Sequence, residues 1–190
     1  MCSLILDLSS LIPYGEKSEE DKEAIKKLGE ILYETECVTI YLSHSLIKNY
    51  RTVLPRELKH RPLLPPFQAS FIRLLPELIK IVSRSRGLLR KTKSFGKAKF
   101  HVLETSRTQL YNVENLGLNE EDDKEILKLA LASASQNDTF LVTTDSDFFE
   151  DLNQIELSKR YPKEWQKLKI VKPNDPKLLA LLVSCKLEKP

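Results

Sequence analysis

The chain has 190 residues, of which 41% are hydrophobic, and its formal net charge at pH 7 is +3. This size and composition predict one folded domain and exclude a low-complexity or collagen-like chain, because glycine is scarce. The three cysteines have neither zinc-site nor redox-pair spacing. No stretch reaches the roughly 18 apolar residues of a membrane span, and we see no signal-peptide pattern, so we expect a soluble cytoplasmic protein.

The N-terminal part of the chain predicts two strands, each followed by a helix. Residues 3–8 form an apolar strand pattern that includes Asp7, a residue that is costly to bury unless it is paired or bound to a metal. Ser18 is typical of a helix cap and precedes an amphipathic helix. A β-branched strand is predicted at 37–42, and a second helix at 43–54.

The middle of the chain interrupts this alternation. Residues 55–66 contain four of the ten prolines and predict a loop, and a helical pattern over 67–82 contains Pro76, which should kink or split it. Residues 84–99 are expected to be mostly loop, with extended pieces at 97–103. The basic residues of this stretch are Arg84, Arg86, Arg90, Lys91, Lys93, Lys97 and Lys99.

That basic stretch is a candidate nucleic-acid contact. It contains no acidic residue, so its positive charges could follow a phosphate backbone. Phe95 and Phe100 offer aromatic faces on which bases could stack. The alternative reading is a solvated loop.

The C-terminal part returns to alternating helices and strands. Asn119 and the acids after it predict a helix N-terminus, and a strand at 139–144 leads into a short helix at 147–152. Trp165 is expected in a polar connector before a last strand at 169–172 and a final helix. The whole alternation predicts a three-layer α/β/α sandwich around a central, mostly parallel, twisted sheet.

Four aspartates are expected at one edge of this sheet. Asp7 and Asp145 end two strands, Asp147 follows Asp145, and Asp123 lies in the first turn of the helix that enters the second strand. Open parallel sheets bind ligands beyond the carboxyl ends of their strands. Because clustered carboxylates repel one another unless a cation neutralises them, we predict that these four residues hold Mg²⁺ or Mn²⁺. The hydroxyl of Thr143 could orient a water molecule there, or Thr143 simply favours a strand end.

Three stretches of the chain resemble the PIN-domain nucleases. They are Leu4-Ile5-Leu6-Asp7-Leu8-Ser9, Asp123-Lys124-Glu125-Ile126-Leu127-Lys128-Leu129-Ala130 and Leu141-Val142-Thr143-Thr144-Asp145-Ser146-Asp147-Phe148. The resemblance implies an endoribonuclease that depends on Mg²⁺ or Mn²⁺ and hydrolyses single-stranded or structured RNA, with DNA not excluded. It adds Ser9 as a site member. Residues 1–190 would form a single PIN-like domain with an inserted segment at about 56–118.

One position departs from the PIN pattern. The family usually places a glutamate in the helix after the second strand, and Asn49 stands there in this chain. An asparagine can coordinate a cation through its carbonyl oxygen but brings no charge. The alternative is therefore a catalytically impaired PIN-like module that binds RNA or a protein partner, such as an antitoxin, or that forms a homodimer.

A weaker resemblance concerns the last strand. Ile170-Val171-Lys172-Pro173 resembles the closing Lys-Pro of phospho-acceptor receiver domains. Receivers need an acidic pair after the first strand, where Asp7 stands alone. No glycine-rich dinucleotide or phosphate loop follows the first strand, so a nucleotide-dependent enzyme is not expected.

Overall fold

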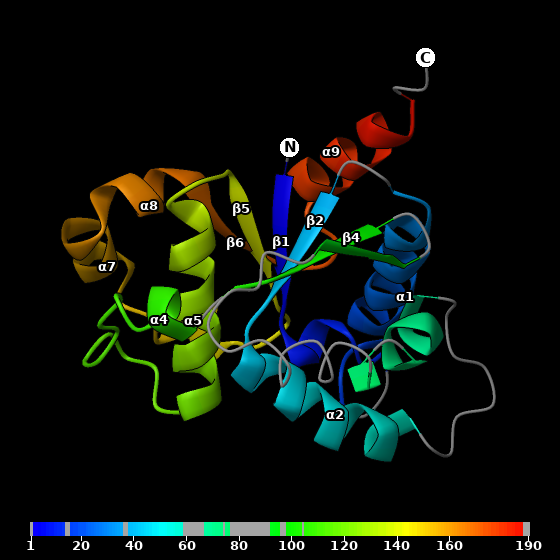
Figure 1. Ribbon diagram of the computed structural model, residues 1–190, viewed down its shortest axis with the longest axis horizontal. Coiled ribbons are helices and arrows are strands. Elements are labelled where there is room, and N and C mark those ends of the chain that lie inside the picture. Colours follow the sequence, from blue (N-terminus) through cyan, green and yellow to red (C-terminus); the bar gives the residue numbers. More distant parts are fainter. Residues whose placement is uncertain are drawn as a thin grey trace.

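The computed structural model describes residues 2–13, 16–35, 38–58, 67–73, 75–76, 92–95, 98–103 and 105–187. These residues form a central sheet with helices packed on both faces, which confirms the predicted α/β/α sandwich (Figure 1). Among the described helices, none combines the length and apolar composition that a membrane crossing needs.

Six strands make up the described sheet, in the order β3-β4-β2-β1-β5-β6. Their bounds are β1 Cys2–Leu6, β2 Val38–Leu42, β3 Thr92–Phe95, β4 Ala98–Val102, β5 Thr139–Val142 and β6 Leu168–Val171. All neighbours pair in parallel except β3 and β4, which are antiparallel. Because β2 and β4 lie on one side of β1 and β5 and β6 on the other, the sheet changes its direction of growth between β1 and β5.

The helices cover the two faces and the carboxyl edge of the sheet. Their bounds are α1 Glu19–Glu34, α2 His44–Leu58, α4 Thr105–Thr108, α5 Glu121–Ala134, α6 Asp147–Glu150, α7 Gln154–Arg160, α8 Pro162–Lys167 and α9 Pro176–Leu187, with a 3-10 helix η1 at Leu8–Ser10. Figure 1 shows α5 on one side of the sheet, α1 on the other, and α2 across the end where β1 and β2 finish. The helix α5 contacts both β1 and β5, the two strands at the switch in sheet growth.

Several predicted helix starts are confirmed by their caps. The Ser18 hydroxyl accepts the N–H of Asp21 over 3.0 Å at the start of α1. The Ser43 hydroxyl accepts the N–H of Leu46 over 3.1 Å at the start of α2. These bonds satisfy backbone donors that a helix leaves unpaired in its first turn.

Two predicted element ends near the acids are wrong by a few residues. The first strand ends at Leu6 rather than at residue 8, because the Asp7 side chain accepts the N–H of Ser9 and turns the chain into η1. Asn119 does not cap α5; Glu120 precedes the helix and makes no side-chain capping bond.

Two further predictions of irregular structure are wrong because packing outweighs local propensity. Pro55 lies inside α2, which continues to Leu58 while burying Leu54. Residues 92–95 form β3, held by pairing with β4 rather than by a strong strand pattern of their own.

The polar connector predicted around Trp165 is also wrong. Two short helices, α7 and α8, occupy it, and Trp165 lies in α8. Asn153 caps the first by accepting the N–H of Glu156 over 3.0 Å, and Pro162 starts the second. Asparagine at a cap and proline at a first helical position are readable signals, so the sequence contained this information.

The middle of the chain contributes to the core. Phe71 stacks on Phe100 of β4 with ring centroids 5.5 Å apart, and both are buried. β4 pairs with β2, so part of the 56–118 segment completes the sheet. Whether this segment is an insertion relative to the PIN pattern stays a prediction.

Candidate functional site

β1 and β5 bring two of the predicted acids together at the carboxyl edge of the sheet. The strands pair with Leu6 beside Val142, and the N–H of Asp7 donates to the Val142 carbonyl over 2.9 Å. Asp145 follows shortly after β5. This place is also where the sheet changes its direction of growth, which is where open α/β sheets bind their ligands.

Asp7 is a buried carboxylate with several hydrogen-bond donors. Only 5% of it is exposed. Its Oδ2 accepts the hydroxyl of Thr143 over 2.8 Å, the N–H of Ser9 over 3.3 Å, and the Ser9 hydroxyl. Burial raises the pKa of the Asp7 carboxyl, and the bonds from Ser9 and Thr143 oppose that shift. Asp7 is therefore fixed in place by the fold.

Thr143 links the ends of the two strands. Its hydroxyl donates to Asp7 and accepts the N–H of Asp145 over 2.9 Å. The Ser9 hydroxyl similarly accepts the N–H of Thr144 over 2.9 Å. The single proton of the Thr143 hydroxyl is directed at Asp7, so Thr143 is a positioning residue in this arrangement. Its expected role in orienting water stays a prediction.

Asp145 and Asp147 lie together where the chain turns into α6. The N–H of Asp147 donates to Oδ1 of Asp145 over 3.1 Å. The negative charge of Asp145, more than burial, raises the pKa of the Asp147 carboxyl. The fully buried Phe148 anchors this turn in the core. The pair therefore projects from a rigid support at the strand end.

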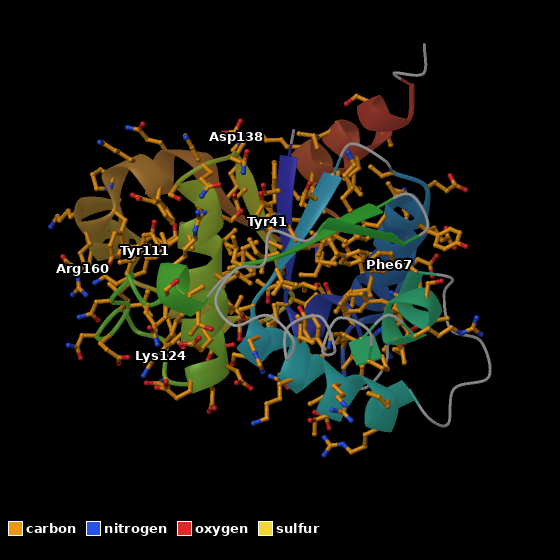
Figure 2. All side chains as sticks on the ribbon, in the orientation of Figure 1. Tyr41, Phe67, Tyr111, Lys124, Asp138 and Arg160 are labelled. Carbon is orange, nitrogen blue, oxygen red and sulfur yellow. The ribbon has the colours of Figure 1, made fainter. Side chains whose placement is uncertain are left out.

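The first turn of α5 brings the fourth acid to the same end of the molecule. In Figure 2, Lys124 marks the lower end of α5, whereas Asp138, just before β5, lies at the opposite end. Asp123 is only 8% exposed. Burial, followed by the negative charges of Asp145, Asp7 and Asp147, raises the pKa of its carboxyl to about 7.

The Asp123 carboxylate has no hydrogen-bond donor among the residues that the structure describes. Its buried neighbour Asp7 has three donors, although the two carboxylates share one edge. The charges of Asp145, Asp7 and Asp147 all raise the pKa of Asp123, so the four predicted acids share this end of the sheet. In the described part of the chain, no three acids, histidines or cysteines form a group that could hold a metal ion, so an ion site at this edge stays a prediction.

Asn49 contacts the edge of this cluster rather than its centre. Its Nδ2 donates to Oδ2 of Asp122 over 2.6 Å, which ties α2 to the first turn of α5. Asp122 is exposed, and its bond to Asn49 is not apparent from the sequence. The two residues are 73 positions apart in the chain, so no local pattern could have paired them.

Tyr50 is a neighbour of the site that the sequence reading missed. It is fully buried, and its hydroxyl donates to the carbonyl of Leu6, next to Asp7. Burial, with a contribution from the Asp7 charge, raises its pKa well above the ordinary tyrosine value. Tyr50 lies in the predicted helix at 43–54, but no local pattern indicated its proximity to Asp7.

The predicted basic stretch is only partly described. Arg84, Arg86, Arg90, Lys91 and Lys97 lie outside the described residues, and Lys93 lies in β3. Lys99 pairs with Thr39 in β2, and Thr39 pairs with Ser3 in β1. Lys99 therefore lies level with the start of β1, away from the acids at the carboxyl ends.

The order of the parallel strands removes support from the receiver-domain alternative. Flavodoxin-like and receiver sheets follow the order 2-1-3-4-5, with the third strand beside the first. In this chain the third parallel strand, β4, pairs with β2 instead. The Lys172 ammonium lies 6.0 Å from the centroid of the Phe149 ring.

Comparisons with known proteins give no family for this chain. No family model, no curated protein and no solved structure matches it.

Proposed function

We propose that the protein is a metal-dependent nuclease of the PIN type that hydrolyses phosphodiester bonds of single-stranded or structured RNA. The observation that carries this proposal is Asp123, a buried carboxylate that accepts no hydrogen bond from the described residues and whose pKa is raised by the charges of four other carboxylates, those of Asp145, Asp7, Asp147 and Glu120. Its oxygens are not fully buried, so water reaches them, but the neighbouring negative charges favour a proton or a cation there. DNA has the same phosphodiester bond and remains a second substrate to test.

The residues present fit a hard divalent cation. Carboxylate oxygens are the ligands that Mg²⁺ and Mn²⁺ prefer, and Asp7, Asp123, Asp145 and Asp147 supply them from β1, α5 and the end of β5. The ion supplies Lewis acidity that stabilises the negative charge on phosphate oxygens.

The chain's own residues hold this geometry. Ser9 and Thr143 fix Asp7, and Thr143 also accepts the N–H of Asp145. Such outer partners orient ligands and tune their basicity. With its pKa raised to about 7, the Asp123 carboxyl retains a proton near neutral pH until a cation replaces it.

The direct test is cleavage of labelled single-stranded RNA with Mn²⁺ or Mg²⁺. We expect wild type to cleave and Asp145→Asn to lose activity by well over the roughly 10–100-fold that the loss of an outer partner costs. Asp138→Asn is the matched control, because Asp138 is exposed at the opposite end of β5. Equal cleavage by wild type and Asp145→Asn would remove the proposal.

One observation favours a second candidate, a module that binds RNA or a protein partner without cleaving. Asn49 brings no charge, and its amide is engaged with Asp122. A binding module should keep its affinity for RNA in EDTA and show no cleavage in Mn²⁺. Cleavage that appears with Mn²⁺ and disappears with EDTA decides for the nuclease.

A further inference from the structure

A groove runs along the free edge of β6. Its volume is about 330 Å³, and Trp165 of α8, Ile170 of β6 and Lys177 of α9 all line it. Among the described strands, β6 is the last in the sheet and pairs only with β5. The groove is therefore open to solvent and lies one strand away from the strand that leads to Asp145.

The region around this groove is rich in lysines that lack an acidic partner. Elsewhere in the described chain, four lysines form ion pairs with acids, Lys22, Lys26, Lys124 and Lys128, whereas others, such as Lys27 and Lys48, form none. Between residues 159 and 177, none of the lysines has a carboxylate partner among the described residues: Lys159, Lys163, Lys167, Lys169, Lys172 and Lys177. The surface next to the acidic site is therefore positively charged.

The nearby acids are already engaged. Asp175, which lines the groove, accepts the N–H groups of Lys177 and Leu178 over 2.9 Å each at the start of α9. Glu164 accepts the Tyr111 hydroxyl over 3.3 Å. Accepting hydrogen bonds does not remove the charge of a carboxylate, so Lys169 and Lys177 together with Asp175 give the groove lining a formal net charge of +1.

Lys172 connects the groove to the acidic site. The carbonyl of Val171, the residue before it, accepts the N–H of Thr143 over 3.0 Å. The ammonium of Lys172 lies 6.0 Å from the ring centroid of Phe149 in α6, the helix that starts at Asp147. From Lys169 to Lys172 the strand advances by about 10 Å. Lys169 and Lys172 therefore place two positive charges between the groove and the acids, on opposite faces of the strand because side chains alternate.

We propose that the β6-edge groove binds single-stranded nucleic acid, with a base on Trp165 and phosphates on Lys169 and Lys177, and that the bound strand continues past Lys172 to the acids. The proposal rests on the proposed function, because it names the path of that enzyme's substrate. Aromatic faces combined with lysines that track a backbone are the common basis of single-strand binding.

An added peptide strand fits this edge less well. Val171 directs its carbonyl to β5, so in a parallel ladder the backbone groups of Leu168 and Ile170 point outward. The N–H of Leu168 already donates to the Glu164 carbonyl, so few backbone groups are left to hold an extended peptide. Lysines at a sheet edge also discourage strand pairing.

The binding test uses the chain's single tryptophan as its reporter. A 12-nucleotide oligouridine is titrated into the wild-type protein in EDTA while the Trp165 emission is recorded. We expect saturable quenching that weakens as salt rises, because phosphate contacts release counterions. A poly-glutamate peptide should leave the emission unchanged. Absence of quenching by the oligonucleotide, or equal quenching by the peptide, overturns the proposal.

Charge variants locate the contact. Lys169→Ala with Lys177→Ala should weaken binding by about tenfold and lower the salt slope by roughly 1.4, the value for two phosphate contacts. The charge-matched control is Lys26→Ala with Lys27→Ala on α1, which should bind as wild type does. Equal weakening in both double variants means a non-specific charge effect and contradicts the assignment to the groove. Trp165→Phe, which keeps an aromatic face, should retain binding measured by anisotropy of the labelled oligonucleotide.

The groove proposal and the hydrolysis proposal can be contradicted independently of each other. EDTA removes the divalent ions, so quenching tests the groove without catalysis, and RNA cleavage in Mn²⁺ tests the acids. Quenching without cleavage keeps the groove and removes the nuclease. Cleavage without quenching keeps the nuclease and removes the groove.

Discussion

Asp7 and Asp123 are two buried carboxylates at the same edge of one sheet, and the structure holds them differently. Asp7 follows a strand and accepts hydrogen bonds from Ser9 and Thr143. Asp123 lies in the first turn of a helix and, within the described residues, accepts none. The pKa of each carboxyl is raised by burial, but only for Asp7 do hydrogen bonds oppose the shift.

This difference separates a carboxylate that the fold already stabilises, Asp7, from one that the described residues do not, Asp123. The end of β1 is built around the charge of Asp7, whereas the start of α5 leaves the charge of Asp123 uncompensated. A cation that binds between them would contact one carboxylate already in place and neutralise the other. Each of the following predictions alters one side of this comparison.

The largest effect is expected from Thr143→Val, which removes a donor from Asp7 and an acceptor from the N–H of Asp145. We expect Mn²⁺ affinity and RNA cleavage to fall by about 10–100-fold. The free energy of unfolding should fall by about 1–3 kcal/mol, because a buried carboxylate loses a partner. Thr143→Ser, which keeps the hydroxyl, is the control. If Thr143→Ser lost as much Mn²⁺ affinity and cleavage as Thr143→Val, the hydrogen-bonding role would be contradicted.

Asp123→Asn is expected to stabilise the folded protein, whereas Thr143→Val is expected to destabilise it. Without divalent ions at pH 8, this substitution should raise the free energy of unfolding by about 1–3 kcal/mol, because it removes a buried charge that lacks a partner. Asp122→Asn at the neighbouring exposed position should change it by less than about 0.5 kcal/mol. Chemical denaturation measures both, and a destabilised Asp123→Asn would show that the charge is satisfied in the native protein.

The pH dependence of stability follows from the same group. The pKa of Asp123 is raised from its ordinary value of 3.8 to about 7 in the folded chain. Between these values the folded form retains a proton that the unfolded form has lost. The free energy of unfolding without divalent ions should therefore fall as pH rises from about 4 to 7, and the slope from this group should stay below the roughly 1.4 kcal/mol per pH unit of a full proton, because solvent screens its partly accessible oxygens.

Asp123→Asn should remove this part of the slope, and denaturation curves at several pH values measure it. An unchanged slope in Asp123→Asn would assign the pH dependence to other groups. The carboxyls of Asp7 and Asp147 have raised pKa values too, so some slope of the same sign should remain in the variant.

The smallest effect is expected from Asn49→Ala. It removes a 2.6 Å bond to the exposed Asp122 at the rim of the cluster. Because exposed contacts of this kind contribute little, we expect a loss of less than about 1 kcal/mol and cleavage close to that of wild type. A loss of cleavage as large as that of Thr143→Val would place Asn49 among the ligands instead.

Local patterns predicted the parts of the fold that position the acids. The apolar runs gave β1, β2, β5 and β6, and the helical period gave α5, whose expected apolar face is buried. Parallel strand topology then placed Asp7, Asp123 and Asp145 at one edge, because the chain order of strands and helices dictates which ends meet.

Features that depend on distant contacts could not be read from the sequence. β3 exists through its pairing with β4, and the Asn49–Asp122 bond joins positions far apart in the chain. Ser9 and Thr143 were both predicted as site residues from the sequence. The sequence did not show that both would donate hydrogen bonds to Asp7. Local sequence also gave no sign that Asp7 would find donors and Asp123 would not.

The measurement that tests the central claim most directly is Mn²⁺ binding by isothermal titration calorimetry, with thermal unfolding as a second readout. Wild type should bind the ion and release protons near pH 7, and at 100 times the dissociation constant it should gain about 2.7 kcal/mol of stability. Asp123→Asn should lose the ion binding and the gain in stability, whereas Asp122→Asn should retain both. Equal Mn²⁺ binding by wild type and Asp123→Asn, or no binding by wild type, would contradict a cation site at this edge of the sheet.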